Sequence, residues 1–356
     1  MKLALTPVSA GRSAARWVVL VGLLMPLGVV VMPTPSSAFA GPDDPGWQRY
    51  QQRFVLAEGR IIDTANADVS HTEGQGWGMF LAVQFGDQGT FDRLWQWTEA
   101  HLARSDVDLF AWRYDPGTTP HVADDNNATD GDLFMAWALQ LAADRWEDRR
   151  YAARSESIRE SIRDHLIVNV GGYDVLLPGL QGFRHDGFAD INLSYWVIPA
   201  LRDFAARYPD EPWQAVIDSG HQLLERAQFG PKGLPADWLR LQRSGELTPA
   251  LEWPTRFGFE NVRTPLYFTW GGLRGVDTLE KIARFWDQPA PPAWIDVRSG
   301  ETASYPLSQG GLAINALLSG RPWAIAKIPA AEENYYSATL LLLARVAASQ
   351  LSLGAR

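Results

Sequence analysis

Residues 70–79 read Ser70-His71-Thr72-Glu73-Gly74-Gln75-Gly76-Trp77-Gly78-Met79, and this stretch indicates the start of a helix. Ser70 and Glu73 have the spacing of a capping box, which would make Glu73 a structural acid in the first turn. Three glycines at alternate positions each cost roughly 1 kcal/mol relative to alanine inside a helix, and a cap does not require them. Close approach of another backbone or of a ligand would explain them. The alternative is therefore that Glu73 lies at the floor of a cleft and that a substrate crosses this helix.

A second unusual stretch follows about fifty residues later. Residues 124–132 hold four Asp and two Asn in the nine positions from Asp124 to Asp132. A calcium loop does not fit, because no register supplies alternating acids, a sixth Gly and a twelfth Glu. Capping by Thr129 with Asp132 in the first turn is the structural alternative. The cluster exceeds what capping needs and suits a ligand that is rich in hydroxyl groups.

Outside these stretches, apolar residues recur at helical spacing, and Gly, Pro and Asp separate the segments. The pattern predicts about eleven helices and no sustained strands. Their expected bounds are 45–57, 73–85, 90–103, 130–146, 152–169, 190–206, 211–229, 260–272, 275–287, 308–318 and 332–349. No linker divides them, so we expect residues 41–356 to form one all-α domain, for which a closed toroid of helical hairpins suits the length. Long loops at 105–128, 170–189 and 230–258 are expected to build a cleft.

The first forty residues have the pattern of a cleavable secretory signal. Three basic residues precede the apolar run 17–32, which leads to the small-residue site Ala38-Phe39-Ala40. An uncleaved membrane anchor is the alternative, but the run is shorter than the roughly 20 residues that a spanning helix prefers. We therefore expect a secreted or periplasmic protein without stable membrane insertion once residues 1–40 are removed.

Composition excludes several classes of chemistry. The chain has no Cys, which excludes a disulfide scaffold, a thiolate metal site and a cysteine nucleophile. Its six His residues show no close metal-ligand spacing, and there is no serine elbow or phosphate-binding loop, so we expect no metal and no cofactor. Loss of three basic residues with the signal changes the net charge from −9 to −12, which disfavours nucleic acid and polyanionic sugars as partners. Among the classes of chemistry considered, hydrolysis by paired carboxylates is the one that remains.

Four segments resemble glycoside hydrolase family 8. Residues 72–79 resemble its S-E-G-Q-G-Y-G-M stretch, and Ala128-Thr129-Asp130-Gly131-Asp132 matches its A-T-D-G-D signature. Asn192-Leu193-Ser194-Tyr195 resembles its N-P-S-Y segment, and Glu260-Asn261-Val262-Arg263 lies where the family usually has D-x-x-R. The similarity runs from about residue 45 to 345 and looks closest to the secreted endoglucanases that accompany bacterial cellulose synthases.

The resemblance implies an (α/α)6 barrel that hydrolyses β-1,4-glucan with inversion at the anomeric carbon. It implies that Glu73 is the general acid and that Asp130 contacts the sugar in the subsite where cleavage occurs. The usual base aligns with Glu260, where this chain has Glu in place of Asp, so either Glu260 or Asp130 is the base. Inverting enzymes need a protonated acid and an ionised base, so Glu73 must be kept protonated by burial and a nearby negative charge.

Candidate sugar contacts come from the same segments and the loops between them: Gln75, Trp77, Trp112, Tyr114, Asp132, Asn192, Tyr195 and Arg263. Trp112 and Tyr114 are the preferred stacking platforms, because the apolar faces of β-linked glucose stack on aromatic rings, with packing in the barrel as the alternative. Arg263, one turn after Glu260, is expected to hold a base ionised by charge pairing, and a routine surface salt bridge is the alternative.

The expected substrate is therefore a β-1,4-glucan such as cellulose, and cellulose synthase machinery is a possible partner. A family relative acting on chitosan, xylan or mixed-linkage glucan is the first alternative function. A catalytically weak glucan-binding accessory protein is the second. A polysaccharide lyase is disfavoured, because an acidic chain repels uronate polymers.

Overall fold

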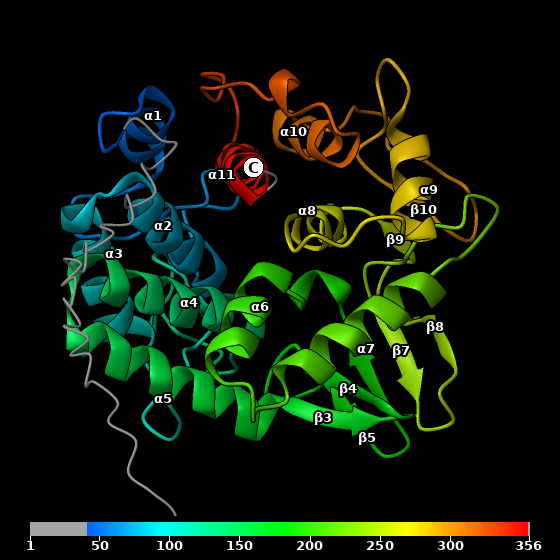
Figure 1. Cartoon of the computed structure of the whole chain (residues 1–356), viewed down its shortest axis with the longest axis horizontal. Coiled ribbons are helices and arrows are strands. Elements are labelled where there is room, and N and C mark those ends of the chain that lie inside the picture. Colours follow the sequence, from blue (N-terminus) through cyan, green and yellow to red (C-terminus); the bar gives the residue numbers. More distant parts are fainter. Residues whose placement is uncertain (1–40, 355–356) are drawn as a thin grey trace, which may run out of the picture. The chain divides into compact units, whose positions relative to one another are not determined.

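The computed structural model describes residues 41–354, and these are mainly helical (Figure 1). The predicted signal, residues 1–40, lies outside the described residues. The helices are α1 (Pro45–Phe54), α2 (Thr72–Phe85), α3 (Gln88–Leu102), α4 (Thr129–Trp146), α5 (Arg149–Leu166), α6 (Ile198–Arg207), α7 (Trp213–Arg226), α8 (Arg263–Trp270), α9 (Asp277–Trp286), α10 (Gln309–Leu318) and α11 (Tyr335–Gly354). Two 3₁₀ helices, η1 (Leu193–Tyr195) and η2 (Pro322–Ala324), accompany them.

Six helices form a closed inner ring. α2, α4, α6, α8, α10 and α11 contact one another in chain order, and α11 returns to contact α2. α1, α3, α5, α7 and α9 pack outside them against α11, α2, α4, α6 and α10 respectively, and η2 stands next to α10 where a sixth outer helix would lie. Figure 1 shows α2, α4, α8 and α11 toward the middle of the view and α3, α5 and α9 toward its edges. The fold is thus the predicted (α/α)6 barrel.

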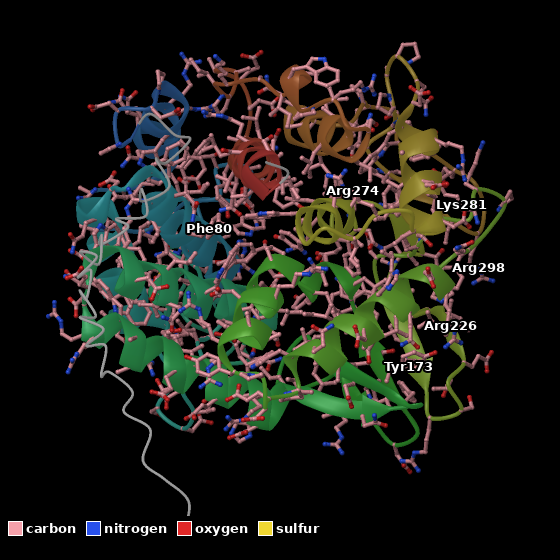
Figure 2. All side chains as sticks on the ribbon, viewed as in Figure 1. Phe80, Tyr173, Arg226, Arg274, Lys281 and Arg298 are labelled. Atoms are coloured by element: carbon pink, nitrogen blue, oxygen red, sulfur yellow. The ribbon has the colours of Figure 1, made fainter. Side chains whose placement is uncertain are left out.

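Residue pattern explains which helices are inside. Most residues of α2 and α4 are buried, among them Phe80 of α2 (Figure 2). The apolar residues of each of these helices surround the whole helix, as expected of a helix covered on all sides. α1 and α7 instead have one buried face and one polar face. Local signals set the ends: Asp44 accepts hydrogen bonds from the N–H groups of Gly46 and Trp47 at the start of α1, and Gly86, with φ of 72°, ends α2.

Ten short strands also occur among the described residues, and the sequence pattern did not predict them. They are β1 (Ser70–His71), β2 (Arg113–Tyr114), β3 (Ile167–Val170), β4 (Tyr173–Leu176), β5 (Arg184–His185), β6 (Phe188–Ile191), β7 (Leu239–Gln242), β8 (Leu247–Pro249), β9 (Arg256–Phe257) and β10 (Ile295–Asp296). All pairings are antiparallel: β5-β6-β7-β8 form one sheet, and β1-β2, β3-β4 and β9-β10 form pairs. Strands of two to four residues are too short to give a recognisable period of two.

One predicted helix starts too early as a result. The expected helix 190–206 contains the end of β6 and then η1, and α6 begins only at Ile198. Between residues 41 and 354, no helix is long and apolar enough to span a membrane.

Candidate active site

The first turns of α2 and α4 lie side by side because Gly131 has no side chain. A Cβ atom at Gly131 would lie 2.5 Å from Thr72 Oγ1 and 2.7 Å from the backbone nitrogen of Glu73, closer than packed atoms allow. The two acids that follow Thr72 and precede Gly131 in the sequence, Glu73 and Asp130, therefore lie at neighbouring helix N-termini. This close approach of two backbones is what the A-T-D-G-D segment provides.

Neither acid-bearing helix begins with the predicted side-chain cap. Ser70 lies in β1, and its hydroxyl group donates to the carbonyl of Ile61, so it does not cap α2. Thr129 is the first residue of α4, and its hydroxyl group donates 2.6 Å to Leu177 O. The capping interpretation of both segments is wrong, and Glu73 and Asp130 are free for other contacts.

Arg263, the first residue of α8, joins three carboxyl groups. Its Nη1 atom contacts Glu73 Oε1 and lies 2.8 Å from Asp130 Oδ2, and its Nη2 atom contacts Glu260 Oε2. The Arg263 side chain is only 4% exposed. The alternative of a surface salt bridge is therefore wrong, because one buried guanidinium group connects acids from the starts of α2, α4 and α8.

Glu260 lies in the turn before α8. Asn192 Nδ2 donates 3.3 Å to Glu260 Oε2, the same oxygen that Arg263 contacts. Burial raises the pKa of Glu260 to about 8, and the charges of Asp237 and Asp130 act in the same direction. Contact with the Arg263 guanidinium group favours the ionised form instead. Glu260 is the most accessible of the three acids, with 36% of its side chain exposed against 20% for Glu73 and 4% for Asp130.

Asp130 is buried and shares the excess negative charge of this cluster. Burial raises the pKa of Asp130 to about 7, while the hydrogen bond from the Gly131 N–H lowers it. Three carboxyl groups around a single guanidinium group leave net negative charge in a poorly solvated place. The cluster is therefore expected to hold a proton near neutral pH. The carboxyl group that acts as the acid must carry this proton, and the one that acts as the base must be ionised.

Three predicted sugar contacts are wrong because their side chains are fully buried and their polar atoms bond to protein groups outside the carboxyl cluster. Gln75 is fully buried and bonds to Ile61 N, Gly59 O and Thr98 Oγ1. Trp77 is fully buried, and its Nε1 atom donates 3.1 Å to the hydroxyl of Tyr267. Asp132 is fully buried as well, accepting from Asn127 Nδ2 and the Phe110 N–H.

The glycines of α2 fit neighbouring parts of the protein. A Cβ atom at Gly74 would meet the Tyr335 hydroxyl at 2.4 Å, one at Gly76 would meet Phe134 Cβ at 2.7 Å, and one at Gly78 would meet Ile61 Cδ1 at 2.2 Å. The prediction that these glycines clear a path for substrate is wrong. They allow α4, α11 and the loop before α2 to pack closely against α2.

Other predicted contacts lie close to the carboxyl cluster. Trp112 is half-buried, and its ring stacks on His71, the residue before α2, with centroids 5.8 Å apart. Tyr195 is half-buried in η1, and burial together with the charges of Asp130 and Glu260 raises its pKa well above the usual value. Asn192 reaches Glu260, although the Asn192 side chain is itself buried.

Tyr114 packs away from the acids. It makes edge contacts with Trp97 and His101 and lies under the Arg60 guanidinium group, which favours packing over sugar stacking. Sequence reasoning also missed residues at the site. Tyr336 donates 2.5 Å to Phe259 O beside Glu260, and Asp237 lies behind the same turn. Neither belongs to a recognisable motif.

Among residues 41–354, no group of three or more His, Asp and Glu residues is arranged to hold a metal ion. Arg263 lies between Glu73, Asp130 and Glu260 and supplies the positive charge in this carboxyl cluster. The arrangement pairs carboxyl groups of unequal exposure around one cation, which suits proton transfer to and from a substrate.

Comparisons with known proteins identify the family and agree with the fold. The family model described as glycosyl hydrolases family 8 matches residues 20–350. An endoglucanase of Cellulomonas uda is 40% identical over 310 residues, covering 85% of this chain and 83% of the relative. A probable endoglucanase of Novacetimonas hansenii is 35% identical, covering 88% and 94%. Among solved structures, endoglucanase Cel10 from Klebsiella pneumoniae matches with a TM-score of 0.82 at 40% identity, covering 85% of this chain and 98% of that one.

Proposed function

Because this chain belongs to glycosyl hydrolases family 8, we propose that it is an endo-acting β-1,4-glucanase that cleaves internal bonds of cellulose or a related β-glucan. In this proposal the bond is broken with inversion of configuration. Glu73 protonates the leaving oxygen, Glu260 accepts a proton from the attacking water, and Asp130 positions the sugar at the cleavage site. Family membership and the endoglucanase relatives support the activity. The division of roles rests on the site.

The contact of Arg263 with Glu73, Asp130 and Glu260 is the observation that carries the proposal. An inverting glycosidase needs one carboxyl group that gives a proton and one that takes it, on opposite sides of the bond, with water beside the base. Glu260 has the exposure that water needs, and Glu73 lies at the start of a different helix. Asp130 is almost entirely buried, so it is better suited to a fixed contact with a sugar hydroxyl than to activating the attacking water.

A panel of polysaccharides tests the substrate. Purified protein lacking residues 1–40 should hydrolyse soluble cellulose derivatives to a mixture of oligosaccharides. Because endo-cleavage breaks internal bonds, the average chain length of the polymer should fall steeply from the earliest times. Mixed-linkage glucan, xylan and chitosan serve as the comparison substrates. Faster hydrolysis of xylan or chitosan would reject the glucan assignment. Binding of glucan without any product would favour the accessory-protein alternative.

Trp112→Ala is expected to weaken substrate binding more than turnover. A stacked aromatic contact contributes about 0.5–1.5 kcal/mol beyond its buried area, so KM should rise roughly 3–10-fold while kcat changes less. Steady-state kinetics on a soluble glucan measures both. Trp323, which is 79% exposed in η2, gives the matched control, since Trp323→Ala should leave KM unchanged. An unchanged KM for Trp112→Ala would return Trp112 to a packing role.

We further propose export, with residues 1–40 removed, and action on nascent glucan beside a cellulose synthase. The charged start, the apolar run and Ala38-Phe39-Ala40 motivate the first part. Intact-mass analysis of exported protein should find a mature chain that starts close to Gly41. Retention of Met1 on a membrane-bound form would contradict it.

A further inference from the structure

Asp237 is hydrogen-bonded to the chain segment that carries Glu260. It lies two residues before β7, and its backbone N–H donates 2.6 Å to the carbonyl oxygen of Arg256 in β9. The segment after Arg256 runs through Gly258 and Glu260 into α8. The backbone of Asp237 is therefore held against the start of the segment whose end forms the carboxyl cluster.

The Asp237 carboxyl group also accepts two backbone hydrogen bonds from the same segment. Its Oδ1 atom accepts hydrogen bonds from the N–H groups of Gly258, at 3.0 Å, and Asn261, at 2.9 Å. These two residues stand on either side of Glu260 in the chain. Gly258 also lets the carboxyl group come near, since a Cβ atom there would lie 3.2 Å from Asp237 Oδ2. One oxygen atom thus fixes the backbone before and after Glu260.

Further contacts brace the far side of this turn. Thr264 Oγ1 donates 2.8 Å to Asn261 Oδ1, and the Tyr336 hydroxyl donates 2.5 Å to Phe259 O. The position of the Glu260 side chain therefore depends on contacts from the segment before β7, from α8 and from α11. Of the three side chains that hold this turn, those of Asp237, Thr264 and Tyr336, only that of Asp237 carries a carboxyl group.

We propose that Asp237 is a positioning residue for the reaction, whose carboxyl group holds the turn that carries Glu260 and whose negative charge sets the pH range in which Glu260 accepts a proton. The proposal rests on the role of Glu260 given above. Asp237 itself need not touch the substrate. It acts through the backbone of residues 258–261 and through its charge.

Several charged and titratable groups face Glu260 and decide the sign of this effect. They are Arg263 from α8, Asp130 from α4, Glu73 from α2, Tyr195 from η1, Tyr336 from α11 and Asp237 from the segment before β7. Only Arg263 among them is cationic, and it favours ionised Glu260. Burial raises the pKa of Asp237 to about 7, so its charge appears near neutral pH and then opposes ionisation of Glu260.

Two substitutions of Asp237 separate its two effects. Asp237→Asn keeps an oxygen that accepts from Gly258 and Asn261 but removes the charge. Glu260 should then ionise at lower pH, and the acid limb of the kcat profile should move to lower pH with kcat at the optimum nearly kept. Asp237→Ala removes the acceptor as well. Misplacing a catalytic group costs up to about 10²-fold, so kcat should fall roughly 10–100-fold with little change in KM.

Asp296→Asn supplies the control. Asp296 Oδ1 accepts from the N–H groups of Arg298 and Ser299, the same kind of turn contact, but Asp296 has no contact with the carboxyl cluster. Its pH profile should match that of the unaltered protein. An Asp237→Asn profile that also matches would overturn the electrostatic part of the proposal, and an unchanged kcat in Asp237→Ala would overturn the positioning part. Thermal unfolding of each variant identifies any that fail to fold.

Failure of the proposed function gives a different result. If unaltered protein cleaves no glucan, or if Glu260→Gln keeps full turnover, the assignment of Glu260 fails before Asp237 is considered. If the protein is active and Glu260→Gln is not, while both Asp237 variants behave like unaltered protein, the assignment of Glu260 stands and the inference about Asp237 is rejected.

Discussion

Glu73→Gln is expected to lower the turnover of β-glucan by about 10²–10⁴-fold, the usual contribution of a positioned acid, while fold and glucan binding persist. Glutamine keeps the shape of the side chain and can still lie beside Arg263, but its amide has no acidic proton to transfer to the leaving oxygen. Initial rates on a soluble glucan, together with a binding measurement on the same polymer, report the two quantities separately.

A synthetic cellooligosaccharide with a nitrophenyl leaving group makes the assignment sharper. Such a leaving group departs without being protonated, so the Glu73→Gln variant should lose far less activity on it than on glucan. Glu280 provides the matched control, because it is an exposed acid in the first turn of α9, and Glu280→Gln should leave both rates unchanged. Equal losses on both substrates would contradict the role of Glu73 as acid and indicate a binding or structural role.

The architecture was predictable because its signals are local. Helical spacing of apolar residues, with stops such as Gly86, identifies most of the helices, and the motifs that carry Glu73 and Asp130 predict the barrel family. The ends of the elements were less predictable. Residues 190–197 contain apolar residues at helical spacing, yet Phe188–Ile191 pairs with Leu239–Gln242, about fifty residues away. Pairing between distant segments has no local signature and overrides helix propensity.

At the site, membership in a sequence motif likewise did not predict which residues could contact a substrate. Gln75 belongs to the motif that identifies the family, but its amide group is hydrogen-bonded to backbone and side-chain groups around it. Burial is a property of the assembled fold, so the sequence alone did not distinguish Gln75 from a sugar ligand. Asp237 is the opposite case. It is an isolated Asp in a long loop, and its importance follows only from the proximity of residues 258–261.

Glu260→Gln is expected to abolish most turnover, by about 10²–10⁴-fold, because it removes the group that accepts the proton of the attacking water. Both Arg263 and Asn192 contact Glu260 Oε2, so a glutamine at this position retains polar partners and the turn should keep its form. Asp130→Asn is expected to differ in kind. As a contact to the sugar, it should weaken substrate binding as well as rate, raising KM while lowering kcat.

Azide distinguishes the two carboxyl groups more directly than rate does. A small anion can take the place of activated water once the base has been removed, because it needs no proton acceptor, and attack on the same face gives a glycosyl azide of inverted configuration. The Glu260 side chain is 36% exposed, so azide can approach the position beside it, whereas the Asp130 side chain is 4% exposed and contacts Arg263. Azide should therefore restore turnover to Glu260→Gln and not to Asp130→Asn. Restoration of only the Asp130 variant would make Asp130 the base and leave Glu260 as an ion-pair partner of Arg263.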